Sequence, residues 1–193
     1  TRGVARRDHG FPEGIEPTIF CMVSPFKRPD ATLREQGLSA VAAPDLRWLR
    51  CDIKAIALLP NVLANQQAHD ADAFEALFIR DGVIIEGSHS NLFGVVDDRL
   101  VTYPSCNYIL TGITRNLLLD LARDLGIPTA EAPIYTDRAD RIQELFLSGT
   151  TTEVMPVTQL DGRPVGSGTR GPVTERLQRA FREKVAELTA SVG

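Results

Sequence analysis

The sequence predicts an α+β domain in which mixed β-sheets are flanked by helices. Short β-branched and aromatic runs, each bounded by turn residues, alternate with only a few segments of helical spacing. No strand–helix–strand unit repeats along the chain, which argues against a Rossmann fold. The 193 residues are enough to bury a core, and 43% hydrophobic with 24% charged residues is an ordinary globular composition.

Turn residues mark out the strands in the first half of the chain. Prolines bound a β-branched and aromatic run at 18–23, which predicts a strand, and a second candidate lies at 38–43. Residues 61–69 follow a proline and have helical spacing. Two turn signals, Asp81-Gly82 and Asp97-Asp98, divide the next stretch into an antiparallel meander. Its strands are expected at residues 74–80, 83–85, 92–96 and 100–103.

The second half contains the clearest predicted helix. Leucines recur at helical spacing over residues 113–125, and Gly126 ends the pattern. Further strands are expected at 144–147 and 154–160, the second followed by an Asp-Gly hairpin turn. A Gly/Ser-rich loop then leads to an amphipathic helix at 172–188.

Charge and cysteine content argue against several classes of function. The 25 acidic and 21 basic residues give a net charge of −4, which argues against a nucleic-acid partner. No apolar run approaches the roughly 20 residues of a membrane span, so no membrane partner is expected. Three cysteines without Cys/His spacing predict no metal site and favour a reduced, cytoplasmic compartment. The chain starts at Thr1 with a stretch typical of the middle of a domain, so we expect an upstream segment to be missing.

Four segments contain residue types suited to chemistry, and each also has a purely structural explanation. Lys54 precedes an apolar run, so it is either a surface lysine or a partly desolvated amine that attacks carbonyls. Glu86 with Gly87 is either a turn or a functional carboxylate. Thr114 opens the predicted helix, where it would cap the helix or line an anion site. Residues 148–152 form a hydroxyl-rich turn, or one side of a phosphate site.

The spacing of these segments is more informative than any one of them. From Glu86 the chain reads Glu-x-Ser-x-x-Asn-Leu-Phe, then Leu-Val-Thr after six residues, then Leu-Thr-Gly-Ile-Thr-Arg after seven more, ending at Arg115. This pattern resembles the signature of the class IV pyridoxal-phosphate aminotransferases, and residues 47–54 are similar to that family's Schiff-base segment. The whole chain is most similar to the D-amino-acid type of the family with its N-terminal portion missing. Branched-chain aminotransferases and aminodeoxychorismate lyases are more distant relatives.

The resemblance implies pyridoxal 5′-phosphate as cofactor and a role for each matching residue. Lys54 would be the catalytic residue, which holds the cofactor through its amine and later moves a proton between substrate and cofactor. Glu86 would keep the ring nitrogen protonated. The other residues expected at the cofactor are Arg47 near the phenolic oxygen, Leu110 on the ring face, and Ile113, Thr114, Gly149 and Thr150 at the phosphate.

Substrate contacts are implied from two subunits. Arg7 and His9 match an Arg-x-His that holds the substrate carboxylate across the dimer interface in the D-amino-acid type, so a homodimer is expected. The residues expected beside the substrate within the same chain are Ser88, His89 and Thr151. The chain departs from the usual pattern at His89, where relatives often carry a hydroxyl residue, and at Gly149, where they often carry serine.

The resemblance also implies a domain division and a reaction. Residues 1–44 would be the end of a small N-terminal domain with its linker, and 45–193 the large cofactor-binding domain. The expected reaction is ping-pong transfer of an amino group between a D-amino acid, such as D-alanine or D-glutamate, and a 2-oxo acid, such as pyruvate or 2-oxoglutarate. The alternatives on this fold are an (R)-amine or branched-chain transaminase and an aminodeoxychorismate lyase. A non-catalytic binding protein is the alternative of another class.

Overall fold

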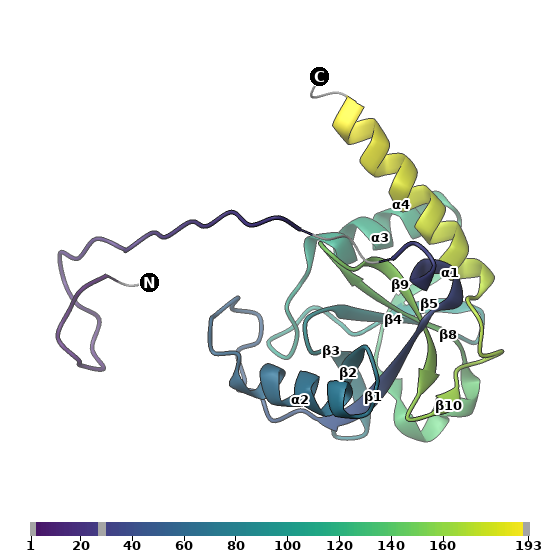
Figure 1. Cartoon of the computed structure of the whole chain (residues 1–193), viewed down its shortest axis with the longest axis horizontal. Coiled ribbons are helices and arrows are strands. Elements are labelled where there is room, and N and C mark those ends of the chain that lie inside the picture. The colour runs from purple at the N-terminus through teal and green to yellow at the C-terminus, as the bar shows by residue number, and fades with distance from the viewer. Residues whose placement is uncertain (1–2, 27–29, 191–193) are drawn as a thin grey trace.

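The computed structural model describes residues 3–26 and 30–190, and its body is one mixed sheet with helices on its outside (Figure 1). The strands are β1 (Leu38–Pro44), β2 (Glu75–Arg80), β3 (Val83–Gly87), β4 (Asn91–Val96), β5 (Arg99–Thr102), β6 (Thr129–Glu131), β7 (Ile134–Tyr135), β8 (Ile142–Gly149), β9 (Glu153–Leu160) and β10 (Arg163–Pro164). The helices are α1 (Leu33–Gln36), α2 (Leu59–Asp70), α3 (Ile113–Asp124), α4 (Pro172–Ala190) and the 3-10 helix η1 (Thr136–Arg141).

The order of the strands shows that the sheet curls round on itself. It runs β6-β5-β4-β8-β9-β1-β2-β3-β7, with β10 paired to β9. The two outermost strands, β6 and β7, are consecutive in the sequence and are separated only by residues 132–133. The ends of the sheet are therefore held near each other. Most neighbours are antiparallel, but β1 is parallel to both β2 and β9, and β5 is parallel to β6. The sheet is therefore mixed, as the α+β prediction requires.

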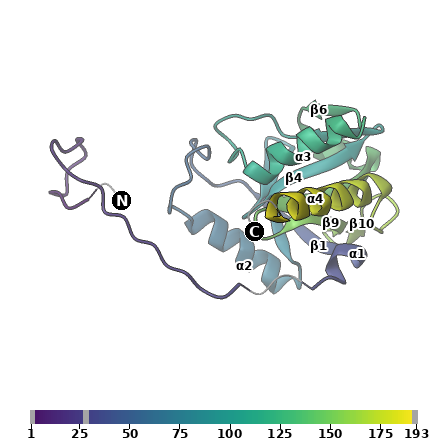
Figure 2. The ribbon, with the colours of Figure 1, turned by 90° about the horizontal axis from the view of Figure 1, so that it is seen from above.

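The alternation of side chains along the strands separates two cores. On β4 and β8, Leu92 and Leu147 belong to one core, whereas Phe93 and Phe146 belong to a second core that includes residues of α3 and α4. Figure 2 shows α3 and α4 beside the sheet. The rings of Phe93 and Phe146 stack with centroids 5.0 Å apart, which contributes about 0.5–1.5 kcal/mol beyond burial. Leu118 of α3 is fully buried in this second core.

Helix α2 lies over a third apolar cluster. Its buried residues, Ala64 and Ala68, pack near Phe78 and Ile85 of the neighbouring hairpin. Small side chains let the helix approach the sheet closely, and the exposed remainder of α2 carries Val62 and Leu63. Helix α2 and the ends of the adjacent strands position the site described below.

Most of the predicted elements are confirmed, and the Asp-Gly signals explain two of the turns. Asp81 and Gly82 adopt φ of 51° and 74°, and Asp161 and Gly162 adopt 49° and 71°, which is the left-handed geometry of tight hairpin turns. Both dipeptides join antiparallel partners. The long predicted helix is present as α3, and Gly126 follows its end with a φ of 67°.

Two predictions about strands are wrong. Residues 18–23 are extended but join no ladder in the described parts of the chain; they belong to an arm at 3–26 that runs away from the body (Figure 1). A β-rich sequence forms a strand only where another strand completes its backbone hydrogen bonds. The four-stranded meander is also interrupted, because β3 pairs with β2 and β7, and β4 pairs with β5 and β8. The two hairpins are present but do not pair with each other.

The division of the chain at residue 44 stays a prediction. Strand β1 pairs with β9 on one side and β2 on the other, so residues 38–44 form part of the same sheet as the rest of the body. We therefore propose that the domain boundary lies before Leu38.

Candidate active site

A cavity of about 870 Å³ opens where β3 and β8 end and where α3 begins. Its walls also include the loop before α2 and the exposed side of that helix. The volume is within the range of pockets that hold small molecules and cofactors. Ten of the residues singled out from the sequence line it: Arg47, Lys54, Glu86, Ser88, His89, Leu110, Ile113, Thr114, Gly149 and Thr150.

Glu86 is a buried carboxylate held by three donors. Arg47 Nη1 donates to its Oε1 at 2.5 Å, while Asn91 Nδ2 and the Leu110 backbone N–H donate to Oε2 at 2.9 and 3.3 Å. Only 5% of Glu86 is exposed, and burial raises its pKa to about 7 although Arg47 acts in the opposite direction. A carboxylate has about four acceptor positions, so Glu86 can accept one more donor from the cavity.

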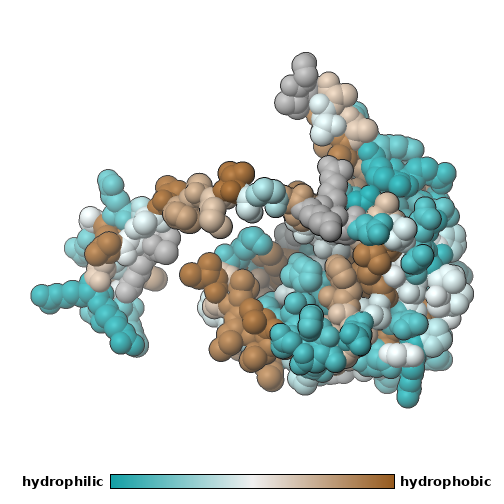
Figure 3. Space-filling model, viewed as in Figure 1, coloured by the Kyte–Doolittle hydropathy of each residue, from teal (hydrophilic) through white to brown (hydrophobic). Residues whose placement is uncertain are grey.

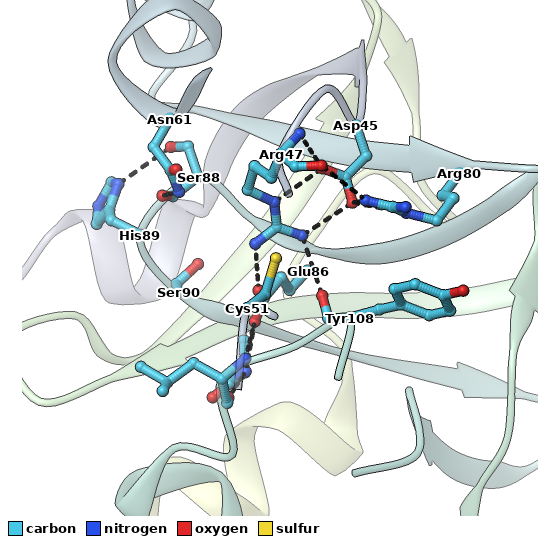
Figure 4. A network of polar contacts seen from close by, with 12 residues as sticks. Asp45, Arg47, Cys51, Asn61, Arg80, Glu86, Ser88, His89, Ser90 and Tyr108 are labelled. Atoms are coloured by element: carbon cyan, nitrogen blue, oxygen red, sulfur yellow. Dashed lines mark hydrogen bonds and ion pairs between the residues drawn. The ribbon is translucent and has the colours of Figure 1, made fainter. Parts of the chain in front are cut away.

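Arg47 pairs with Glu86 and is held from behind by Asp45. Its Nε and Nη2 donate to the two carboxylate oxygens of Asp45 at 2.8 and 3.0 Å, and Nη2 also donates to the Tyr108 carbonyl at 3.2 Å (Figure 4). Its guanidinium stands 4.2 Å above the centroid of the Phe78 ring. All three of its nitrogens contact protein acceptors, and Arg47 also lines the cavity. Its place near the phenolic oxygen of the cofactor stays a prediction. Its two carboxylate partners raise the pKa of Arg47.

The N-terminus of α3 and the end of β8 form a second polar part of the cavity. Thr114 lies in the first helical turn and is buried, where unpaired backbone N–H groups and the helix dipole favour an anion. Gly112 comes before the helix, and a Cβ at this position would collide with Asn91 Oδ1. Among the described residues, the Ser148 hydroxyl is buried without a hydrogen-bond partner, and it also lines the cavity. These donors fit the oxygens of a phosphate group.

Lys54 lies on the cavity wall but is exposed to solvent. The Lys54 amine is therefore not desolvated within a single chain, and the interpretation drawn from the sequence is wrong for the single chain. The loop around Lys54 carries apolar side chains that are also exposed: Ile53, Ile56, Leu58 and Leu59. Figure 3 shows the hydrophobic patch over the loop that leads into α2.

Comparison with known proteins identifies the family of this chain. The family described as amino-transferase class IV matches residues 1–160. The chain belongs to the class IV aminotransferases. It is 40% identical over 190 residues to a D-alanine aminotransferase of Bacillus licheniformis, covering 98% of this chain and 67% of that protein. It is 42% identical over 186 residues to a D-alanine aminotransferase of Staphylococcus aureus, covering 96% and 66%.

Solved structures agree with this class IV assignment. A branched-chain amino acid aminotransferase from Thermobaculum terrenum, in its pyridoxal-phosphate holo form, has a TM-score of 0.72 and 29% identity, over 82% of this chain and 54% of that chain. The Escherichia coli branched-chain enzyme has a TM-score of 0.68 and 35% identity, over 77% and 52%. The chain thus spans about two thirds of the curated relatives and about half of these solved structures.

Three residues singled out from the sequence lie away from the cavity of this class IV chain. Thr151 is exposed in the turn after β8 and is not part of the cavity wall. Arg7 and His9 are exposed on the arm at 3–26, outside the wall of the cavity in their own chain. Their proposed role therefore depends on a second copy of the chain.

Glu75 is a residue of the site region that sequence reasoning missed. It is fully buried in β2 and accepts hydrogen bonds from the His89 backbone N–H at 2.8 Å and from the Ser90 hydroxyl at 2.9 Å. Ser88 Oγ and His89 Nδ1 lie 3.4 and 3.3 Å from its Oε1. Burial raises the pKa of Glu75. The sequence does indicate a special role for Glu75, because it is an acid inside the apolar run at 73–79, where an unpaired charge would be unfavourable. Glu75 fixes the 88–90 turn that forms one wall of the cavity.

Proposed function

We propose that this protein transfers an amino group between a D-amino acid and a 2-oxo acid, with pyridoxal 5′-phosphate as cofactor. The observation that carries the proposal is the juxtaposition of the buried Glu86 carboxylate, the Lys54 amine and the anion-binding end of α3 around one cavity. Identity of 40–42% to D-alanine aminotransferases supports the D-amino-acid substrate class.

Bound pyridoxal phosphate supplies an electron sink for the negative charge that develops at the substrate α-carbon. Glu86 would accept the N–H of the ring nitrogen and keep that nitrogen positively charged. Leu110 would pack on the ring face. The residues proposed to bind the phosphate are Ile113, Thr114, Gly149 and Thr150, with the unpartnered Ser148 hydroxyl as an additional donor.

Lys54 would act as the base. Its Nζ would take the proton from the substrate α-carbon and return it to the other side of the transferred nitrogen. The exposed apolar side chains around Lys54 would then exclude water from the amine once another surface covers them.

We further propose a homodimer in which the arm of one chain completes the cavity of the other. Arg7 and His9 would bind the substrate carboxylate there, with Ser88, His89 and Thr151 toward the substrate. The exposed apolar residues on the arm support such contact: Ile19, Phe20, Met22 and Val23. The three free cysteines support a cytoplasmic location, and in the described parts of the chain no helix is both long and apolar enough for a membrane span.

Mixing two variants that are each impaired with D-alanine tests the shared site. A dimer of one Lys54→Ala chain and one Arg7→Ala chain has a single intact site, with Lys54 from one subunit and Arg7 from the other. Random mixing makes half of the dimers mixed, so about one quarter of the normal activity should return. Activity that stays at the level of the separate variants would contradict the shared site.

Kinetics with Arg7→Ala test the substrate class. The variant should lose about 10–150-fold in kcat/KM for D-alanine, the equivalent of about 1.5–3 kcal/mol for a hydrogen bond to a charged group. An (R)-amine without a carboxylate should react equally well with both proteins. A wild-type protein that prefers the amine would support the amine-transaminase alternative.

A branched-chain transaminase is the second candidate, because the structural neighbours described above are branched-chain enzymes. Transfer from L-leucine faster than from D-alanine would favour it. The D-amino-acid reaction predicts faster transfer from D-alanine. We favour this reaction because the sequence identity to D-alanine aminotransferases is higher than to either branched-chain neighbour.

A further inference from the structure

Four charged side chains of alternating sign lead from the surface to the cavity (Figure 4). Arg80 donates from Nε and Nη2 to Asp45 Oδ2 at 3.0 and 2.8 Å. Asp45 in turn accepts from Arg47, and Arg47 donates to Glu86. The formal charges of these four residues sum to zero.

The chain of charges is almost closed to water. The side chains of Asp45, Arg47 and Glu86 are 0%, 7% and 6% exposed, and that of Arg80 is 16% exposed. The Arg80 guanidinium lies 4.6 Å from the centroid of the Tyr108 ring, as Arg47 lies over Phe78. Charges interact more strongly here than at an exposed surface, because little water screens them.

Asp45 has no place among the residues that line the cavity, yet it determines how Arg47 meets Glu86. It accepts from the Arg47 side chain through both oxygens and from the Arg47 backbone N–H at 3.1 Å. Its own backbone N–H donates to the Ile79 carbonyl at 2.9 Å, which attaches it to β2. The guanidinium thus has a single orientation, with Nη1 directed at Glu86 Oε1.

We propose that Asp45 is a positioning residue for the ring nitrogen of the cofactor, which acts by orienting Arg47 and offsetting its charge. This inference rests on the proposed function. A protonated ring nitrogen would bring a second cation to Glu86, which already faces Arg47. The two cations near the cavity would then be Arg47 and the ring nitrogen, and the two anions facing them would be Asp45 and Glu86. Because Asp45 offsets the charge of Arg47, Glu86 remains a strong acceptor for the ring nitrogen.

Asp45→Asn removes the offsetting charge while keeping the size of the side chain. Glu86 also faces the Cys51 thiol, the Asn91 amide and the Leu110 N–H, none of which carries a charge to replace Asp45. In a carboxyl ¹³C NMR titration of the unliganded protein, the Glu86 signal should therefore titrate at a lower pH than in the wild type. That signal is assigned as the one lost in Glu86→Gln.

Binding of pyridoxamine 5′-phosphate provides the second measurement, since this form has no aldehyde and binds without a bond to Lys54. Its affinity should fall at least about tenfold in Asp45→Asn, as expected for disturbing a charged hydrogen bond. The matched control is Asp52→Asn, which breaks an exposed Arg50–Asp52 pair of the same spacing and should change affinity less than about twofold. An Asp45→Asn variant that only melts earlier, with unchanged titration and affinity, would show a merely structural role and overturn the proposal.

Two further variants keep the test decisive if Asp45→Asn does not fold. Arg47→Met should move the Glu86 titration to higher pH, and the double variant Arg47→Met/Asp45→Asn should bring it back down toward the wild-type pH. Identical titrations for these two variants would mean that Asp45 exerts no effect on Glu86. Absence of cofactor binding by the wild-type protein would refute the proposed function, while the titrations would still decide the electrostatic inference.

Discussion

Replacing Glu86 with glutamine should change how the stability of the unliganded protein depends on pH. The folded protein raises the pKa of Glu86 to about 7 from the ordinary 4.5, chiefly through burial. A raised pKa means that the folded state binds the proton more tightly than the unfolded state. The stabilisation is fully present below pH 4.5 and is lost as pH rises through 7. The shift corresponds to a stability difference on the order of 3 kcal/mol.

The assay is urea unfolding of wild type and Glu86→Gln at pH 5 and pH 8. Glutamine does not titrate, so the free energy of unfolding of the wild type minus that of the variant should fall by most of this amount between the two pH values. Taking the difference cancels the contributions of the other titrating groups. Glu187→Gln, at an exposed carboxylate paired with Lys184, is the matched control and should change stability by no more than about 0.5 kcal/mol.

A wild-type-minus-variant difference that is equal at pH 5 and pH 8 would refute the argument. It would mean that the three donors around Glu86 compensate fully for its burial. A difference that grows with pH would reverse the sign and show that those donors outweigh burial.

Two other perturbations test the catalytic and the structural parts of the site. Lys54→Ala should abolish turnover and the visible absorbance of the bound cofactor while leaving weaker binding through the phosphate contacts, and near-normal turnover would contradict the role of Lys54. Gly87→Ala should destabilise the fold by about 1–3 kcal/mol, because the new Cβ would lie 2.8 Å from Glu75 Cδ and would also strike its carboxylate oxygen. Thermal unfolding checks this, with Gly10→Ala as control, since a Cβ there meets no atom within 4 Å.

Much of the local structure could be predicted from the sequence because short-range chemistry determines it. The Asp-Gly turns require residues that tolerate positive φ, and leucine spacing identifies α3. The signature from Glu86 to Arg115 brought together residues that the fold places around one cavity. These features depend on neighbours within a few residues or on a pattern of fixed spacing.

The remainder depended on partners distant in sequence, which a single sequence does not specify. One of the two partners of β4 is β8, about fifty residues away, whereas the turn signals at Asp81-Gly82 and Asp97-Asp98 indicated a continuous meander of neighbouring strands. Arg47 meets Glu86, which is 39 residues away, only once β1, β2 and β3 are side by side. The strand at 18–23 failed for the same reason: its composition suits a sheet, but no strand in the described part of its own chain lies beside it.

The short outer strands of the curled sheet affect how the protein can associate. An exposed sheet edge offers free backbone donors and acceptors to any other extended chain, and long edges promote aggregation. Here β6 has three residues and β7 has two, and the chain passes directly from one to the other. Each edge offers so few ladder positions that a second chain gains little by adding a strand. At these two edges, any contact with another copy would depend mainly on side chains, whose identity determines which surfaces meet.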